Sequence, residues 1–331
     1  MYNMLLDAHF DVLLDVLSYR KKGERKVLER RHFQNLKEAG ISTIICSLYI
    51  SDIFLPEGAL RNALDQISAL KEELEESREL FSLCRNSSEA KAASEKGKIG
   101  LFLSLEGAEP LGNDIFLLRT FYDLGVRLVG LTWSRRNYAG DGSSFDPADA
   151  PRHPGGLTKF GRELVMEAQK MGMVIDVSHL NDPGFYEVAE LIKAPFIASH
   201  SNCRALCGSA RNLKDDQIKM IAESGGVVGL NAYSPFVSDN EADRNTDKFF
   251  EHLQHITQVA GIDNVGLGLD LCDCIASLSM GNDDSRQKDL FTDHLDAARR
   301  FIVPMKKKLS PGDYYAFTGG NFMRVIERVL G

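Results

Sequence analysis

The stretch MVIDVSHLNDPGFYEVAELIKAPFIASHS, residues 173–201, contains two short apolar runs, each ending at or just before a histidine. The runs 173–177 and 196–200 are rich in Val, Ile and Phe, which favours β-strands. His200 follows His179 by 21 residues, which is about the length of one strand–helix–strand step. The stretch therefore predicts an α/β protein with histidines at matching positions of neighbouring parallel strands.

The same alternation of short apolar runs and longer amphipathic stretches continues along the chain. Leu164 and Ala168, for example, share one face of a helix predicted over residues 158–171. Eight strands that alternate with helices predict a (β/α)8 TIM-type barrel, with residues 1–331 forming a single catalytic domain. A doubly wound open sheet is the alternative fold. The eight predicted strands are Met4–Asp11, Ile41–Ser47, Ile99–Leu105, Val126–Leu131, Met173–Val177, Phe196–His200, Gly226–Asn231 and Asn264–Asp270.

Composition narrows the possible partners. The 331 residues include 39 Lys+Arg and 47 Asp+Glu, for a formal net charge of −8, which argues against binding to nucleic acid or to an anionic membrane. No apolar stretch reaches the ~20 residues of a transmembrane helix, and the start MYNMLLDAHFD lacks the features of a secretory signal. We therefore expect a cytoplasmic protein with reduced cysteines and a small-molecule substrate. Whether it forms a homodimer stays open.

Polar residues occur at the carboxyl ends of the predicted strands, where barrel enzymes build their active sites. His9 and Asp11 lie two residues apart at the end of the first strand, so both side chains can point into the barrel mouth. Glu106 ends the third predicted strand, and a carboxylate there is costly to bury unless it is paired or coordinated. Together with His179 and His200, these residues predict a metal site, for which zinc is a natural occupant.

Three further features belong to the same end of the predicted barrel. Asp270 ends the eighth predicted strand and could exchange protons with a reacting group. Two long polar loops, Ser134–Gly156 and Ile275–Gln287, follow the fourth and eighth predicted strands, and loops of that length are usually functional or disordered.

His252 and His255, by contrast, have no carboxylate motif beside them, so we expect them to pack rather than bind metal.

Short motifs in a particular order complete the pattern and run along nearly the whole chain. Together they resemble the membrane dipeptidase (renal dipeptidase) family of zinc metallopeptidases, which have an amidohydrolase-like barrel. The motifs are DAHFD (7–11), SLEG (104–107), LTWSRRNYAGDG (131–142), IDVSH (175–179), ASHSNCRAL (198–206), SARNLKDD (209–216), HLQHITQVAGIDNVGLGLD (252–270) and GGNFMRVIERVL (319–330).

The resemblance implies a ligand set for two zinc ions. It implies that His9 and Asp11 bind one ion, that His179 and His200 bind the other, and that Glu106 and a water or hydroxide bridge both. Paired metal ions of this kind lie about 3.5–4 Å apart.

Roles for three further residues also come from the resemblance. Arg211 matches the arginine that holds the substrate's terminal carboxylate. Asp270 matches an aspartate that assists proton transfer to the leaving nitrogen, and Tyr233 aligns with a substrate-contacting tyrosine.

The chain departs from the family pattern at two positions near the predicted site. Trp133 stands where several members have a histidine, so we expect it to shape the substrate pocket rather than exchange protons. The alternative is that Trp133 is a packing residue. The usual Asp-Phe-Asp-Gly after the last strand is replaced by residues 270–273, Asp-Leu-Cys-Asp. There is also no lipid-anchor signal, so the family name implies no membrane location here.

We therefore expect a binuclear zinc dipeptidase that hydrolyses free dipeptides through a metal-bridging hydroxide and accepts a D-residue at the C-terminal position. An N-acyl amino-acid amidohydrolase, or another small amide or lactone hydrolase with the same metal site, is the alternative. A non-catalytic metal-binding scaffold is a third hypothesis.

Overall fold

The computed structural model describes residues 4–145, 148, 151–276 and 288–331. Its strands are β1 (Leu6–Phe10), β2 (Thr43–Tyr49), β3 (Phe81–Leu83), β4 (Ile99–Glu106), β5 (Val126–Gly130), β6 (Val174–Asp176), β7 (Val228–Leu230) and β8 (Val265–Leu267). Its helices are α1 (Val12–Lys21), α2 (Gln34–Ala39), α3 (Ala59–Glu76), α4 (Ser87–Glu95), α5 (Phe116–Leu124), α6 (Lys159–Lys170), α7 (Asp182–Leu191), α8 (Asp215–Ser224), α9 (Thr246–Ala260), α11 (His294–Ala297), α12 (Pro311–Tyr315) and α13 (Asn321–Leu330).

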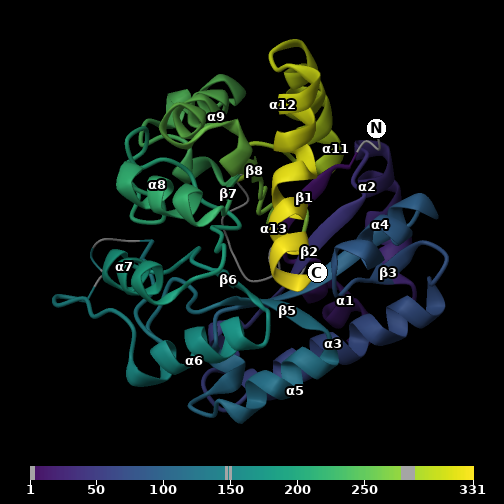
Figure 1. Ribbon diagram of the computed structural model, residues 1–331. Coiled ribbons are helices and arrows are strands. Elements are labelled where there is room, and N and C mark those ends of the chain that lie inside the picture. Colours follow the sequence, from purple (N-terminus) through teal and green to yellow (C-terminus); the bar gives the residue numbers. More distant parts are fainter. Residues whose placement is uncertain (1–3, 146–147, 149–150, 277–287) are drawn as a thin grey trace.

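The strands curl into a parallel barrel with helices around it (Figure 1). Strands β1, β2, β4, β5 and β6 pair in that order, and β7 pairs with β8. The segment 196–201 joins these two groups, because Ile197 bridges Asp176 of β6 and Ala198 bridges Val228 of β7. The predicted TIM-type barrel is confirmed, and the strands do not form a doubly wound open sheet.

Two elements differ from the prediction. The predicted strand Phe196–His200 forms only single bridges to its neighbours, because the Ser199 amide donates a hydrogen bond to Asp176 Oδ1 (2.9 Å) instead of to a neighbouring backbone. Strand β3 was not predicted. Its three residues are too few to show a periodic pattern, and it pairs with the first residues of β4.

The barrel interior is filled by an apolar cluster that keeps polar groups away from one end. Helix α13, yellow in Figure 1, crosses the strands, and its Phe322, Met323 and Ile326 belong to this cluster. Polar side chains are therefore left to gather at the opposite end, where the strands finish. The strand residues of the cluster are Leu6, Ala8, Ile45, Phe102, Leu128, Val174, Ile197 and Val227.

A buried aspartate connects the first and last strands. Asp7 Oδ1 accepts a hydrogen bond from the Leu269 amide (2.8 Å), just beyond β8, and Asp7 Oδ2 lies 2.8 Å from His294 Nε2. The pairing of β1 with β2 shifts register between Asp7 and Phe10. Such a bulge re-aims side chains, so His9 can face the barrel mouth directly after Ala8 has packed in the interior.

The two long loops that the sequence predicts follow β5 and β8. The first is described apart from residues 146, 147, 149 and 150, whereas residues 277–287 of the second lie outside the described residues. Among the residues that the structure describes, no helix combines the length and apolarity needed to cross a membrane. The cytoplasmic location stays a prediction.

Gly268 and Gly229 allow the segment 196–201 to lie close to β7 and β8. A Cβ at either position would overlap the carbonyl oxygen of Ser199. We predict that Gly268→Ala lowers the free energy of unfolding by about 1–3 kcal/mol, because the rigid backbone beside it must shift. Chemical denaturation measures the effect. Gly312→Ala is the matched control, since its nearest neighbouring atom is 3.8 Å away; equal stability of the two variants would contradict the close approach.

Candidate metal centre

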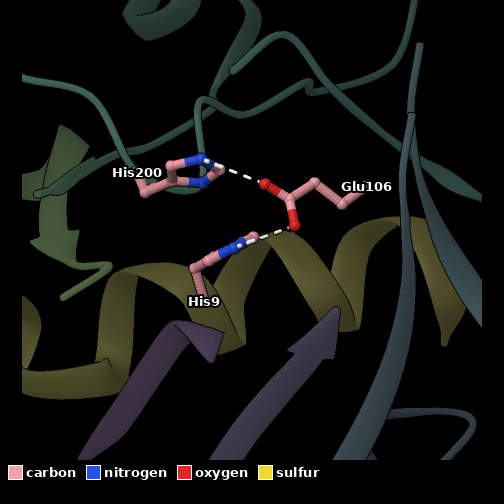
Figure 2. Close-up of side chains that lie close together, drawn as sticks. All are labelled: His9, Glu106 and His200. Atoms are coloured by element: carbon pink, nitrogen blue, oxygen red, sulfur yellow. Dashed lines mark ion pairs between the residues drawn. The ribbon is translucent and has the colours of Figure 1, made fainter. Parts of the chain in front are cut away.

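Glu106, the last residue of β4, lies at the centre of a buried polar cluster (Figure 2). Its Oε2 is 3.5 Å from His9 Nε2, which comes from β1. Its Oε1 is 3.1 Å from His179 Nε2 and 4.0 Å from His200 Nε2. The two oxygens of one carboxylate therefore face histidines from different parts of the barrel.

Two carboxylates complete the cluster on the His9 side. Asp11 Oδ1 lies 3.9 Å from His9 Nε2, and Asp270 Oδ1 lies 3.8 Å from the same nitrogen. Two overlapping groups of candidate ligand atoms result, each within 4.8 Å: His9 with Glu106 and His200, and His9 with Asp11 and Asp270. The structure thus brings all five predicted metal ligands and Asp270 together at one end of the barrel.

Two buried polar atoms of the cluster have no hydrogen-bond partner among the residues that the structure describes. They are His9 Nε2 and Glu106 Oε2, the atoms that face one another across the cluster centre. An unsatisfied buried polar atom is costly, and imidazole nitrogens and carboxylate oxygens are common ligands of zinc. The donor set of the cluster therefore fits a bound metal ion.

Neighbouring hydroxyl groups hold the ligand side chains in a metal-binding orientation. Ser134 Oγ is hydrogen-bonded to His179 Nδ1 (2.8 Å), and Ser199 Oγ to His200 Nδ1 (2.7 Å). Both rings therefore turn their Nε2 atoms, 2.7 Å apart, toward the cluster. The hydroxyl of Ser47 donates a hydrogen bond to Asp11. Partners of this kind fix the ring orientation of metal-ligating histidines.

Electrostatics favour the metal-binding protonation state at His179, His200 and Glu106, but they favour the protonated form of His9. Burial lowers the pKa of His179 to about 3, with Arg211 contributing, and burial lowers the pKa of His200 well below its ordinary value. Burial opposes ionisation of Glu106, but the charge of His9 and a hydrogen bond from His179 lower its pKa overall. Burial also lowers the pKa of His9, but the adjacent carboxylates, chiefly Glu106, raise it to about 10 overall. A metal ion would displace the His9 proton.

The backbone is strained at two residues of the cluster. His179 has φ = +68° and Asp270 has φ = +53°, in the left-handed region that residues other than glycine seldom adopt. Residues held there are concentrated at functional sites, where the surrounding structure offsets the strain. In both cases the strained residue lies three residues beyond the end of a barrel strand, β6 or β8, and directs its side chain to the cluster.

Arg211 is a buried cation without an anionic partner among the described residues. It is 3% exposed, its Nη2 donates to the His200 carbonyl (3.3 Å), and its Nε has no hydrogen-bond partner. Burial lowers its pKa to about 10, although Asp270 and Glu106 oppose this effect. A buried guanidinium in this position can receive a carboxylate through two parallel hydrogen bonds.

Trp133 and Tyr233 lie on the aromatic rim of the cluster. The Trp133 ring stacks on His179, with 5.7 Å between ring centroids and 27° between planes. Tyr233 contacts Phe236 (4.9 Å), and the Arg211 guanidinium lies 5.4 Å from the same Phe236 ring. Neither Trp133 nor Tyr233 is hydrogen-bonded to a cluster ligand in the part of the chain that the structure describes.

The sequence did not reveal every residue that supports the cluster. His294 has no recognisable motif, yet it is buried against Asp7, and its ring meets Phe10 edge-on. The serines that orient the histidines were missed too, although Ser199 directly precedes a predicted ligand. His252 and His255 pack as expected: His252 binds the Val237 carbonyl (2.9 Å) and His255 binds Asp215 (2.7 Å).

Comparison with known proteins gives consistent matches. A family model described as membrane dipeptidase (peptidase family M19) matches residues 2–330. Over 177 residues the chain is 36% identical to an Acinetobacter calcoaceticus protein described as an uncharacterized protein in the PQQ-III 3′ region. That alignment covers 53% of this chain and 56%, just over half, of the relative's length.

Solved structures match over nearly the full length of the chain. One is a dipeptidase, a metallopeptidase of family M19, with 29% identity, a TM-score of 0.87 and 100% coverage of both chains. Another is a metallopeptidase from Rhodobacter sphaeroides with a phosphinate mimic of the dipeptide L-Ala-D-Ala, with 28% identity, a TM-score of 0.84 and coverage of 98% and 99%. An amidohydrolase from Pseudomonas aeruginosa, 22% identical with a TM-score of 0.78 and coverage of 99% and 97%, shares the fold.

The Ser134 hydroxyl offers a direct test of the candidate metal centre. We predict that Ser134→Ala lowers zinc affinity by about 10–100-fold, because the His179 ring loses the hydrogen bond that orients it. Competition with a chromophoric chelator measures the affinity. Ser134→Thr should retain most of it, and exposed Ser88→Ala is the control; undiminished affinity in Ser134→Ala would refute this role.

Proposed function

Since the chain belongs to the membrane dipeptidase family, peptidase family M19, we propose that it is a zinc-dependent dipeptidase that hydrolyses free dipeptides. The observation that carries this proposal is a pair of buried atoms without hydrogen-bond partners among the described residues, His9 Nε2 and Glu106 Oε2. The Arg211 guanidinium, which has no anionic partner among these residues, lies nearby and donates a hydrogen bond to the His200 carbonyl. The His9 and Glu106 atoms suit a hydrolytic metal ion, and the Arg211 guanidinium suits a carboxylate. A dipeptide carries an amide bond and a carboxylate only one residue apart.

We assign the metal ligands as a two-zinc set. His9 and Asp11 would hold one ion, His179 and His200 the other, and Glu106 both. The shared role of Glu106 is supported by its geometry, since Oε2 faces His9 and Oε1 faces His179. When bound, zinc ions polarise a scissile carbonyl and make a water molecule nucleophilic at neutral pH.

Asp270 is the proposed proton carrier. Its Oδ2 accepts a hydrogen bond from Asn231 (2.9 Å), which holds Oδ1 toward His9, and its side chain is 14% exposed. Burial raises its pKa, so the carboxylate can accept the proton of the attacking water. The carboxyl group then donates that proton to the departing amine, in the manner of a general base that becomes a general acid.

Arg211 is the proposed anchor for the C-terminal carboxylate of the substrate. An anchor close to the cluster selects the peptide bond that precedes the C-terminal residue, because that bond lies only one residue from the carboxylate. We extend the proposal to a D-residue at the C-terminal position. The phosphinate mimic of L-Ala-D-Ala bound by the Rhodobacter sphaeroides protein supports this stereochemistry.

A second candidate function is hydrolysis of N-acyl amino acids, because Arg211 would recognise their carboxylate equally well. Hydrolysis of another small amide or of a lactone would use the same metal ligands. These candidates differ from a dipeptidase in the group that precedes the scissile bond. Only a dipeptide carries a free amine there.

A substrate panel tests the proposed function. We predict that the zinc-loaded protein hydrolyses L-Xaa-L-Xaa and L-Xaa-D-Xaa dipeptides and leaves matched N-acyl amino acids and lactones largely intact. Release of free amino acid is the measurement. Turnover of N-acyl substrates alone would replace the dipeptidase assignment, and no turnover of any substrate would favour a metal-binding scaffold.

The Arg211 anchor makes a separate prediction. Arg211→Met should raise KM for free dipeptides by about 10–100-fold, the loss expected for a charge-assisted hydrogen bond, and should change KM for C-terminally amidated dipeptides much less. Arg211→Lys should lie between the wild-type protein and Arg211→Met, because it keeps the charge but not the planar fork. Equal effects on both substrate types would exclude the carboxylate anchor.

A further inference from the structure

A cavity of about 400 Å3 adjoins the metal cluster on the side of Trp133. Its size falls within the range of small-ligand pockets. Trp133 and Phe145 form its apolar wall, and both rings also contact His179, at 5.7 and 6.2 Å between centroids. The cavity therefore lies beside His179 of the cluster, and its lining contains none of the five residues that would bind metal.

The charged residues that line the cavity are paired with one another. Arg135 Nη1 binds Asp52 Oδ1 (2.9 Å), and Arg136 Nη2 binds Asp141 Oδ2 (2.8 Å). The remaining nitrogens of Arg135 bind Glu109 Oε1 (2.9 Å) and a backbone carbonyl (2.8 Å). Because these ion pairs neutralise the charges of the described lining residues, that lining offers aromatic surface rather than a spare charge to an incoming group.

Phe145 is the ring that gives the cavity its apolar character. It is 46% exposed, although it stacks on Phe236 (5.7 Å, 4° between planes) and contacts Trp133 (5.2 Å). Phe145 and Trp133 together form a contiguous aromatic surface with polar residues around it, which is typical of a ligand-binding groove. An incoming apolar group would cover Phe145 and remove its face from water.

The positions of Arg211 and Phe145 determine which end of a substrate reaches the cavity. The Arg211 guanidinium contacts the Phe236 ring, Phe236 stacks on Phe145, and Phe145 contacts Trp133, so two aromatic rings lie between Arg211 and Trp133 in this series of contacts. A dipeptide with its carboxylate at Arg211 and its peptide bond at the metal cluster directs its N-terminal residue away from Arg211. That residue meets Trp133 and Phe145.

We propose that the cavity beside Trp133 and Phe145 binds the N-terminal side chain of the substrate and selects large apolar or aromatic residues. This inference rests on the proposed dipeptidase function and specifies its substrate class. Charged N-terminal side chains are disfavoured, since they would compete with the ion pairs of Arg135 and Arg136. Glycine is a poor substrate residue because it leaves the aromatic wall uncovered.

Kinetics with a series of Xaa-Ala dipeptides test the proposal. We expect kcat/KM to be higher for Phe-Ala and Leu-Ala than for Gly-Ala, Glu-Ala and Lys-Ala. Phe145→Ala should lower the ratio of kcat/KM for Phe-Ala to that for Gly-Ala by about tenfold, and Phe145→Tyr should retain it. Phe116→Ala, which removes an exposed ring on α5, is the matched control and should leave the ratio unchanged.

Tryptophan fluorescence provides a readout that needs no turnover. Trp133 is the single tryptophan of the chain, so all tryptophan emission reports on this cavity. A phosphinate dipeptide mimic with a benzyl side chain on the N-terminal side should shift the emission, and one with a hydrogen there should shift it much less.

Different outcomes separate this inference from the proposed function. Hydrolysis of dipeptides without preference for the N-terminal residue, or an equal effect of Phe145→Ala on Phe-Ala and Gly-Ala, overturns the cavity assignment and leaves the dipeptidase function intact. Preference at the C-terminal residue alone also overturns it. If no dipeptide is hydrolysed, the proposed function fails. A shift of the tryptophan emission with the benzyl mimic then supports the cavity assignment, and the absence of a shift overturns it.

Discussion

The burial of the Glu106 carboxylate at the end of β4 is the constraint on which the rest of the site depends. A buried carboxylate needs compensating charge or hydrogen bonds, and here three histidine rings face its two oxygens. The rings come from three separate barrel segments, so the compensation requires the strands to close around the carboxylate. Hydrogen bonds outside the cluster, such as that between Ser199 and His200, then determine which nitrogen each ring turns inward.

The parts of the site that could be predicted are those whose signal is local in sequence. His9 and Asp11 share a strand end, and His179 and His200 end equivalent steps of a repeating unit, so pattern and spacing indicate both pairs. The supporting contacts are non-local: His294 meets Asp7 across almost the entire chain. The segment 196–200 was predicted as a strand because composition does not show that Asp176 binds the Ser199 amide.

The arrangement around the cluster divides substrate recognition between charge and apolar surface. Arg211 is buried without an anionic partner among the described residues. Leaving a buried charge unpaired costs about 3–5 kcal/mol, so binding of a substrate carboxylate would remove this cost. In the cavity beside Trp133 and Phe145, the ion pairs of Arg135 and Arg136 leave aromatic surface as the main source of affinity. Trp133 fits this division, because its indole ring extends the apolar wall of the cavity.

The central claim is that Glu106 holds two metal ions together, and the zinc content of purified protein tests it most directly. Elemental analysis after zinc loading and removal of excess metal should find two zinc ions per chain in the wild-type protein and in the exposed control Glu79→Gln. Glu106→Gln should retain at most one, because an amide lacks the charge and the second acceptor oxygen of a bridging carboxylate. Two zinc ions per folded chain of Glu106→Gln would contradict the account.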